Sequence, residues 1–136
     1  MTDATPEKKY KILIVDDDNF LLEMYAMKFN QSTLFSVDTA LGSMPAYEKM
    51  KNGNVPDVIL LDIVMPGMDG FELLEKMRAE KVAPEAVVII LSNRGQQADV
   101  DRGQKLGASG YIVKASSTPS EVIEKVSEIV TKAKGK

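Results

Sequence analysis

Two observations in the 136-residue sequence predict an α/β protein built around a mainly parallel five-stranded sheet. Five short apolar runs alternate with five stretches that have the pattern of helices. Several of these runs show no polar alternation, which is typical of strands buried on both faces. Right-handed crossovers leave few topologies for such a chain. We therefore expect a doubly wound (βα)5 fold with the flavodoxin-like strand order 2-1-3-4-5.

The first two strand–helix units are predicted from residues 10–15 onward. A helix is expected to begin around Asn19, capped by Asp18 or Asn19, because apolar residues then recur on one face. Residues 34–38 predict a shorter strand at or near a sheet edge. The helix after it has Pro45 in its first turn, where proline is well tolerated.

The third and fourth units follow the same pattern. Residues 58–61 form an unbroken apolar run, and Asp69 with Glu72 resembles a capping box for the next helix. Residues 86–91 predict the fourth strand, and the helix expected at 96–106 is mostly polar. This helix offers few residues for packing, namely Ala98, Val100 and Leu106. We expect it to shift more easily than its neighbours.

The fifth unit combines a strand at 110–113 with a helix at 119–133. Thr118 and Glu121 supply the cap and the third-position glutamate of a capping box. One side of the helix is apolar and consists of Val122, Ile123, Val126, Ile129 and Val130. We expect one domain over residues 1–136, with frayed tails at 1–9 and 131–136.

Composition excludes several classes of function. The chain has no cysteine and no histidine, which excludes thiolate or histidine metal sites and a Ser-His triad. A formal net charge of −3 argues against direct nucleic-acid binding. No apolar run approaches the length of a membrane span or a signal peptide, so we expect a cytoplasmic protein without membrane contact.

Chemically active residues follow four of the predicted strands directly. They are Asp16 and Asp17, Asp62, Ser92 and Lys114. Ligands of open α/β sheets bind at this carboxyl edge. Singly, each residue has an ordinary explanation as a turn, cap or solvated side chain, with Asp62 evenly balanced between cap and function. Their convergence at one edge favours a functional site.

This set of residues fits phosphoryl chemistry. Three clustered carboxylates need a cation, and oxygen ligands favour Mg²⁺, with Mn²⁺ as an alternative. Phosphoryl transfer depends mainly on positioning and on neutralising charge. Asp62 can act as the nucleophile and form an aspartyl phosphate, with Ser92 and Lys114 contacting the phosphoryl oxygens.

The same residues lie in motifs that resemble the response-regulator receiver domain. The motifs are residues 15–17, residues 57–70 with Met-Pro-Gly-Met-Asp-Gly, Ser92, and residues 107–114. The resemblance covers roughly residues 9–130 and implies that Asp62 accepts a phosphoryl group from a histidine kinase or a histidine phosphotransfer protein. It also implies a stoichiometric phosphoacceptor that dephosphorylates itself slowly, rather than an enzyme.

The resemblance further assigns the supporting roles. Asp16 and Asp17 would form the Mg²⁺ pocket with Asp62 and the backbone carbonyl of Val64. Ser92 and Tyr111 would be the switch pair, and Lys114 would bind phosphate. The face formed by residues 96–133 would report phosphorylation to a downstream protein that the sequence does not identify. The resemblance implies that the chain itself is a monomer or a phosphorylation-dependent dimer.

The sequence departs from the family pattern near the site. Ala115 stands where receivers usually have a cis proline, so we expect a trans peptide or a rearranged loop. Val64 and Arg94 are not suited to orienting an attacking water, and Asn93 is larger than the usual small residue. We therefore expect a long-lived phosphoryl group.

Other functions fit the same fold. The chain could be the receiver of a longer transcription factor, although only six residues follow Val130, which favours a stand-alone module. An enzyme or flavin-binding protein is possible because fold does not set function, but no phosphate-cradling glycine-rich loop follows Val15. A docking module that works without phosphorylation is disfavoured because the full set of phosphorylation residues is present.

Overall fold

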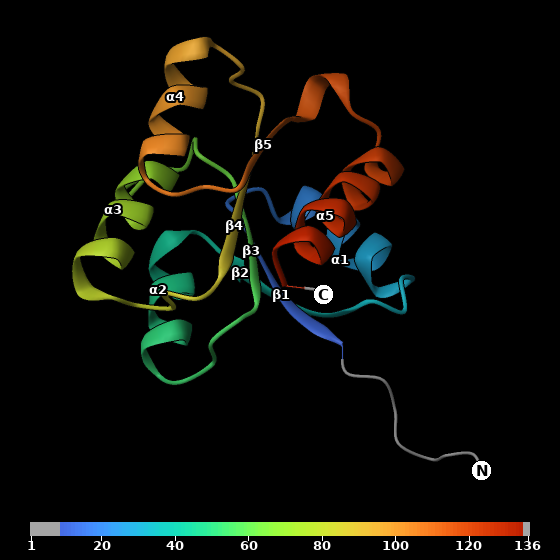
Figure 1. The fold of residues 1–136 in the computed structure, drawn as a ribbon, viewed down its shortest axis with the longest axis horizontal. Coiled ribbons are helices and arrows are strands. Elements are labelled where there is room, and N and C mark those ends of the chain that lie inside the picture. Colours follow the sequence, from blue (N-terminus) through green and yellow to red (C-terminus); the bar gives the residue numbers. More distant parts are fainter. Residues whose placement is uncertain (1–8, 135–136) are drawn as a thin grey trace.

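The computed structural model describes residues 9–134 and contains one parallel sheet with the order β2-β1-β3-β4-β5 (Figure 1). The strands are β1 (Tyr10–Asp16), β2 (Phe35–Leu41), β3 (Val58–Leu61), β4 (Val87–Ser92) and β5 (Gly110–Val113). The helices are α1 (Asn19–Asn30), α2 (Ser43–Lys51), α3 (Gly70–Glu80), α4 (Gln97–Lys105) and α5 (Pro119–Lys134). The predicted fold class and strand order are therefore confirmed.

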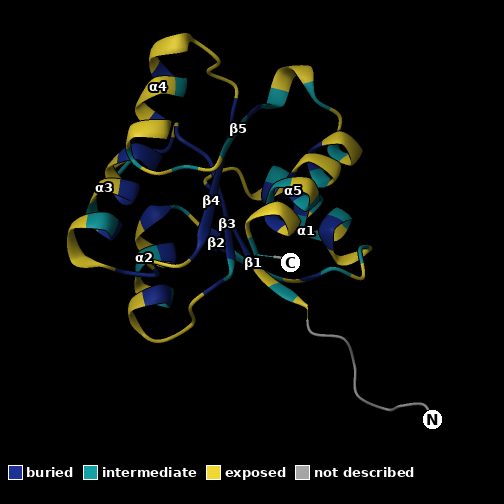
Figure 2. Cartoon of the chain, viewed as in Figure 1, coloured by how far each residue is buried: buried dark blue, intermediate teal, exposed yellow. Residues whose placement is uncertain are grey.

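The sheet forms the middle of three layers. In Figure 1, α1 and α5 cover one face, and α2, α3 and α4 cover the other. Side chains alternate between two apolar cores: Ile12 and Ile14 pack with α1 and α5, whereas Leu13 and Val15 pack with α2 and α3. Burial on both faces explains why the sequences of β3 and β4 show no polar alternation (Figure 2).

The helix starts agree with the sequence signals. The Asp18 carboxylate caps α1 by accepting from the backbone N–H groups of Phe20 and Leu21 at 3.0 and 3.2 Å. Asp69 and Glu72 form the predicted capping box of α3. A second box links Thr118 with Glu121 at the start of α5, with bonds of 2.8 and 3.2 Å.

Several predicted boundaries were wrong. β2 is not short: it runs through Leu41 and pairs with β1 over its whole length, although it lies at the sheet edge as expected. Strand β1 ends one residue later than predicted, at Asp16, and β4 ends one residue later, at Ser92. Residues 131–134 lie within α5, and the other residues expected to fray, except Lys9, lie outside the described part.

Helix α4 packs differently from the prediction. Ala98 is exposed, and the buried residues of the helix are Asp99 and Gly103. A Cβ atom on Gly103 would come within 2.7 Å of the Ile90 side chain, so the glycine brings α4 close to β4. Close approach at a glycine thus replaces the apolar contact expected from Ala98.

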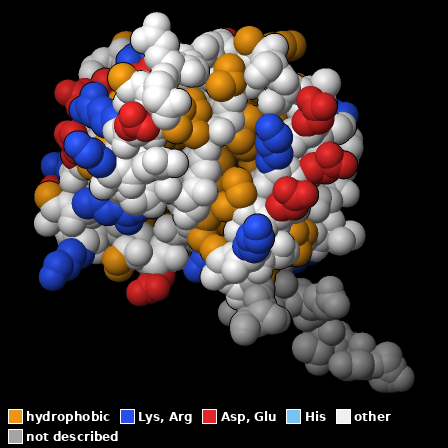
Figure 3. All heavy atoms as spheres, turned by 45° about the horizontal axis from the view of Figure 1, so that its top comes forward, with side chains coloured by type: hydrophobic (Ala, Val, Ile, Leu, Met, Phe, Trp, Pro, Cys, Tyr) orange, Lys and Arg blue, Asp and Glu red, His pale blue; other side chains and the backbone are white. Residues whose placement is uncertain are grey.

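The surface carries charges of both signs. On the face shown in Figure 3, acidic and basic side chains lie on both sides of a band of apolar side chains. This distribution accords with the small net charge of −3. None of the helices within residues 9–134 combines the length and the apolar character that a membrane span requires.

Candidate functional site

The residues predicted to form the site meet at the carboxyl edge of the sheet. Asp16 and Ser92 end β1 and β4, whereas Asp62 and Lys114 directly follow β3 and β5. All four side chains line one open hollow together with Asp17. The parallel register of β1, β3, β4 and β5 brings these strand ends together. The structure therefore places these predicted residues around one site.

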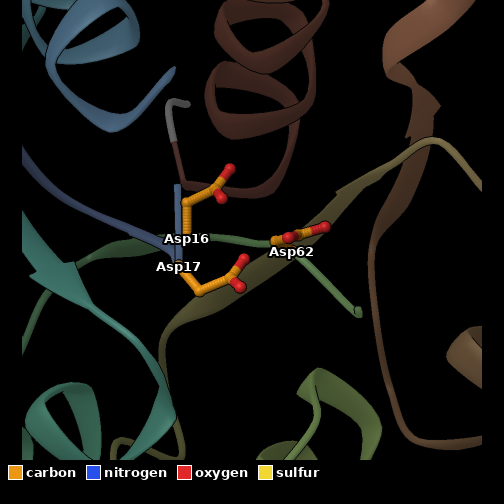
Figure 4. Close-up of side chains that lie close together, drawn as sticks. All are labelled: Asp16, Asp17 and Asp62. Atoms are coloured by element: carbon orange, nitrogen blue, oxygen red, sulfur yellow. The ribbon is translucent and has the colours of Figure 1, made fainter. Parts of the chain in front are cut away.

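Three carboxylates form the acidic side of this hollow. One oxygen from each of Asp16, Asp17 and Asp62 lies within 4.8 Å of the others, and the three side chains lie close together (Figure 4). Asp16 and Asp62 are buried, whereas Asp17 is exposed to solvent. Hard oxygen donors at this spacing fit a small divalent cation such as Mg²⁺.

Lys114 lies against the acidic cluster. Its Nζ atom is 2.8 Å from Oδ2 of Asp16 and 3.7 Å from Oδ1 of Asp62. Burial by itself would lower the pKa of Lys114, but the hydrogen bond to Asp16 and the charge of Asp62 outweigh it, so the pKa is raised. The ammonium group therefore stays charged and neutralises part of the buried negative charge.

Burial disfavours the charged form of the Asp62 carboxylate. Burial raises its pKa to about 6, Lys114 opposes this change, and Asp16 adds to it. The backbone N–H of Ile63 donates to Oδ1 at 2.9 Å and fixes the carboxylate. Behind it, a Cβ on Gly70 would lie 2.3 Å from the Asp62 carbonyl oxygen, so only glycine fits there. The Ile63 N–H thus holds one oxygen of the carboxylate, and the close approach at Gly70 fixes the backbone that carries it.

Ser92 and Tyr111 are connected through Arg94. The Ser92 side chain is fully buried, and its Oγ accepts the backbone N–H of Arg94 at 3.1 Å. The Tyr111 hydroxyl donates to the Arg94 carbonyl oxygen. Tyr111 is partly buried, and it is not among the residues that line the hollow. The proposed switch residues therefore meet at the loop after β4, not at the carboxylates.

The residues that depart from the family pattern lie in or near the hollow. Val64 is 54% exposed at the rim of the hollow. The guanidinium group of Arg94 binds Asp99 at 2.9 Å, and Asn93 lines the hollow. No cis peptide bond occurs within residues 9–134, so the bond before Ala115 is trans as predicted, and residues 114–116 form a 3-10 turn.

Sequence reasoning missed the role of Asp99. This residue lies in the first turn of α4 and is buried despite its charge. A carboxylate in the first turn of a helix usually interacts with the positive end of the helix dipole. The sequence alone therefore offers no reason to connect Asp99 with the site. Its spacing of five residues from Arg94 is the one signal that could have suggested the pair.

Comparison with known proteins agrees with this geometry. A family model described as "Response regulator receiver domain" matches residues 12–127. The transcriptional regulatory protein ResD of Bacillus subtilis is 36% identical over 126 residues, which cover 90% of this chain and 49% of the relative. The phosphate regulon transcriptional regulatory protein PhoB of Rhizobium meliloti is 32% identical, with coverages of 91% and 53%. The chain thus spans about half the length of these relatives.

Solved structures show the same similarity. A CheY-like receiver domain protein from Methanospirillum hungatei has a TM-score of 0.81 at 28% identity, covering 93% of this chain and 97% of that one. A receiver domain described as "BeF3 Activated DrrB" has a TM-score of 0.74 at 26% identity, with coverages of 90% and 98%. The similarity extends over nearly the whole of both solved chains.

Proposed function

The chain belongs to the response regulator receiver domain family, and we propose that it is the phosphoacceptor of a two-component phosphorelay. In this proposal, Asp62 is the residue that receives the phosphoryl group. The observation that carries it is the grouping of Asp62 with Asp16, Asp17 and Lys114 in one hollow. A buried carboxylate beside a fixed ammonium group and further oxygen ligands suits transfer of a charged group.

The transfer is a displacement at phosphorus. A carboxylate oxygen of ionised Asp62 attacks the phosphorus of a phosphohistidine on a histidine kinase or a phosphotransfer protein. The new P–O bond forms as the P–N bond breaks, and the electron pair of that bond goes to the imidazole nitrogen. Lys114 then contacts a phosphoryl oxygen by charge, and the Ser92 hydroxyl donates a hydrogen bond to another.

Asp16, Asp17 and Asp62 would hold the divalent cation, with the backbone carbonyl of Val64 as a further ligand. The donor set of oxygen atoms fits Mg²⁺, and Mn²⁺ is an alternative. When bound, the cation would neutralise charge on the transferring phosphoryl group. Lys114 already bonds one of these ligands, Asp16, so it balances part of the cluster's charge without a cation.

The output of the domain would be a change of the face formed by α4, β5 and α5. Ser92, at the hollow, is linked to Tyr111, on β5, through the backbone of Arg94. A displacement of Ser92 toward a phosphoryl group therefore has a direct path to this face. The downstream partner of this face would be a protein, and the chain would be a monomer or a phosphorylation-dependent dimer.

Control of transcription is a second candidate for the output. Both relatives compared above are named as transcriptional regulatory proteins, and the chain covers only 49% and 53% of their lengths. In that case the receiver would act on an effector region of the same protein. This candidate shares the phosphoacceptor step and differs only in the partner of the α4–β5–α5 face.

The phosphoryl group should be long-lived. Val64 is apolar and exposed at the rim, and the guanidinium group of Arg94 is engaged by Asp99. Neither side chain is suited to orienting an attacking water for hydrolysis. A Val64→Asn, Arg94→Glu double variant should therefore lose the phosphoryl group faster than the wild type in a time course. Equal rates would contradict this expectation.

The test of the proposal is incubation with Mg²⁺ and acetyl phosphate, followed by intact-mass measurement. We expect the mass of one phosphoryl group to be added to the wild type and not to Asp62→Ala. Asp101→Ala, an exposed carboxylate on α4, is the matched control and should be phosphorylated normally. If the wild type gains no phosphoryl group from acetyl phosphate or from a histidine kinase, a phosphorylation-independent docking function would be favoured instead.

A further inference from the structure

Arg94 joins three parts of the molecule through three different groups. Its backbone N–H donates to Ser92 Oγ at 3.1 Å, and its carbonyl oxygen accepts from the Tyr111 hydroxyl. Its guanidinium group donates to Oδ1 of Asp99 at 2.9 Å. The loop after β4 is therefore tied at one residue to the site, to β5 and to α4.

The contact with Asp99 joins this loop to α4 through side chains. The Arg94 side chain is 51% exposed and that of Asp99 only 12%, so the ion pair is shielded from water on the Asp99 side. Gln96, at the N-cap of α4, makes no capping hydrogen bond with its side chain. The buried residues of this short helix are Asp99 and Gly103. The Arg94–Asp99 pair therefore helps to position the start of α4.

A phosphoryl group on Asp62 would disturb this arrangement at Ser92. The Ser92 hydroxyl lies at the hollow, while its oxygen accepts the N–H of Arg94. A Ser92 hydroxyl that is drawn toward Asp62 as it donates to a phosphoryl oxygen either stretches its bond to Arg94 or pulls the loop with it. A hydrogen bond of this kind weakens within a few tenths of an ångström, so the loop must follow or the bond must be given up.

We propose that the Arg94–Asp99 ion pair is a latch that holds the loop after β4 in the unphosphorylated arrangement. The latch opposes the movement of Ser92 and so weakens binding of a phosphoryl group at Asp62. This inference rests on the proposed phosphoacceptor function of Asp62. In thermodynamic terms, the pair stabilises one of two loop arrangements, and its removal shifts the population toward the other.

The simpler alternative is that the pair only stabilises the fold. Many ion pairs at protein surfaces contribute little, and a pair of this kind would have no effect on the site. The two accounts differ in the sign of one effect. Loss of a latch strengthens binding at Asp62 even if the fold becomes less stable, whereas loss of a stabilising contact leaves binding unchanged or weakens it.

The test uses beryllofluoride, BeF3⁻, with Mg²⁺ as the probe of the phosphoryl site. Asp99→Asn, Arg94→Met and the double variant are compared with the wild type by NMR titration. Asp101→Asn is the matched control, because Asp101 lies on the same helix and bonds Gln97 of that helix. Thermal unfolding without the probe, followed by circular dichroism, reports stability separately.

The latch predicts that each single variant binds BeF3⁻ about fivefold more tightly than the wild type, with unchanged or lower thermal stability. The double variant should gain no more than either single variant, because both remove the same contact. Asp101→Asn should match the wild type. Unchanged or weaker binding in the single variants, with normal binding by the wild type, would overturn the latch alone. Failure of every form to bind BeF3⁻ and to accept phosphate would overturn the phosphoacceptor function and the latch with it.

Discussion

At the scale of single residues, the site depends on how Lys114 compensates a buried acidic cluster. Its ammonium group is 2.8 Å from Asp16 and 3.7 Å from Asp62. Without it, the two buried carboxylates would lose this fixed positive charge. Lys114 therefore prepares the site for the negative charge of a phosphoryl group before that group arrives.

Replacing Lys114 with methionine should reduce phosphorylation by acetyl phosphate by about a hundredfold, because a charge fixed near the transferring group is lost. Initial rates by intact-mass measurement check this prediction. Lys125→Met is the control, since Lys125 is an exposed residue on α5 away from the hollow. Similar rates for Lys114→Met and the wild type would show that Lys114 does not act on the phosphoryl group.

The raised pKa of Asp62 predicts a pH-dependent stability difference in the metal-free protein. Because its pKa is about 6 in the folded protein and near 4 when unfolded, folding favours the protonated form. The free energy of unfolding of the wild type should therefore fall as pH rises from about 4 to 6. In Asp62→Asn, this fall should be missing, because the amide does not ionise.

Urea unfolding with EDTA at pH 4 and pH 7.5 measures this difference. The free energy of unfolding of Asp62→Asn minus that of the wild type should grow by about 2–3 kcal/mol between these pH values. Titrating groups that do not interact with Asp62 are common to both proteins and cancel in the difference. A difference in the free energy of unfolding that does not change with pH would mean that burial does not destabilise the ionised Asp62 carboxylate.

At the scale of elements, α4 differs most from its neighbours. Five residues of α3 are buried, including Phe71 and Met77, whereas α4 buries only Asp99 and Gly103. Few apolar contacts and a charged residue inside predict easy local opening. A helix of this kind is suited to respond to a change in the loop that precedes it.

Amide hydrogen exchange should show this difference directly. We expect the amides in the middle of α4 to exchange faster than those in the middle of α3, because opening α4 exposes less apolar surface. Peptide-level mass spectrometry on the metal-free protein checks the prediction. Equal protection of the two helices would indicate that they open only together with the whole fold.

The elements also show what local sequence could predict. Caps at Asp69 and Thr118 were identified because capping is a contact between near neighbours in sequence. The length of β2 was missed because Asp38 and Thr39 interrupt its apolar pattern. An edge strand tolerates such residues, since its pairing with β1 involves the backbone.

At the scale of the whole molecule, the carboxyl edge of the sheet explains why most of the site was predictable. Parallel strands bring their ends to one edge, so residues far apart in sequence converge whenever the strand assignment is right. Asp16 and Lys114 are 98 residues apart and form an ion pair by this means. Arg94–Asp99 escaped prediction because side-chain contacts of a loop depend on packing that periodicity does not encode.

The central claim is that Asp62 carries the phosphoryl group, and chemical mapping tests it most directly. After incubation with Mg²⁺ and acetyl phosphate, borohydride reduction converts an aspartyl phosphate to homoserine, which peptide mass spectrometry locates. The account predicts homoserine at position 62 and at no other aspartate. Homoserine at Asp16 or Asp17, or its absence from a protein that has gained a phosphoryl group, would contradict the account.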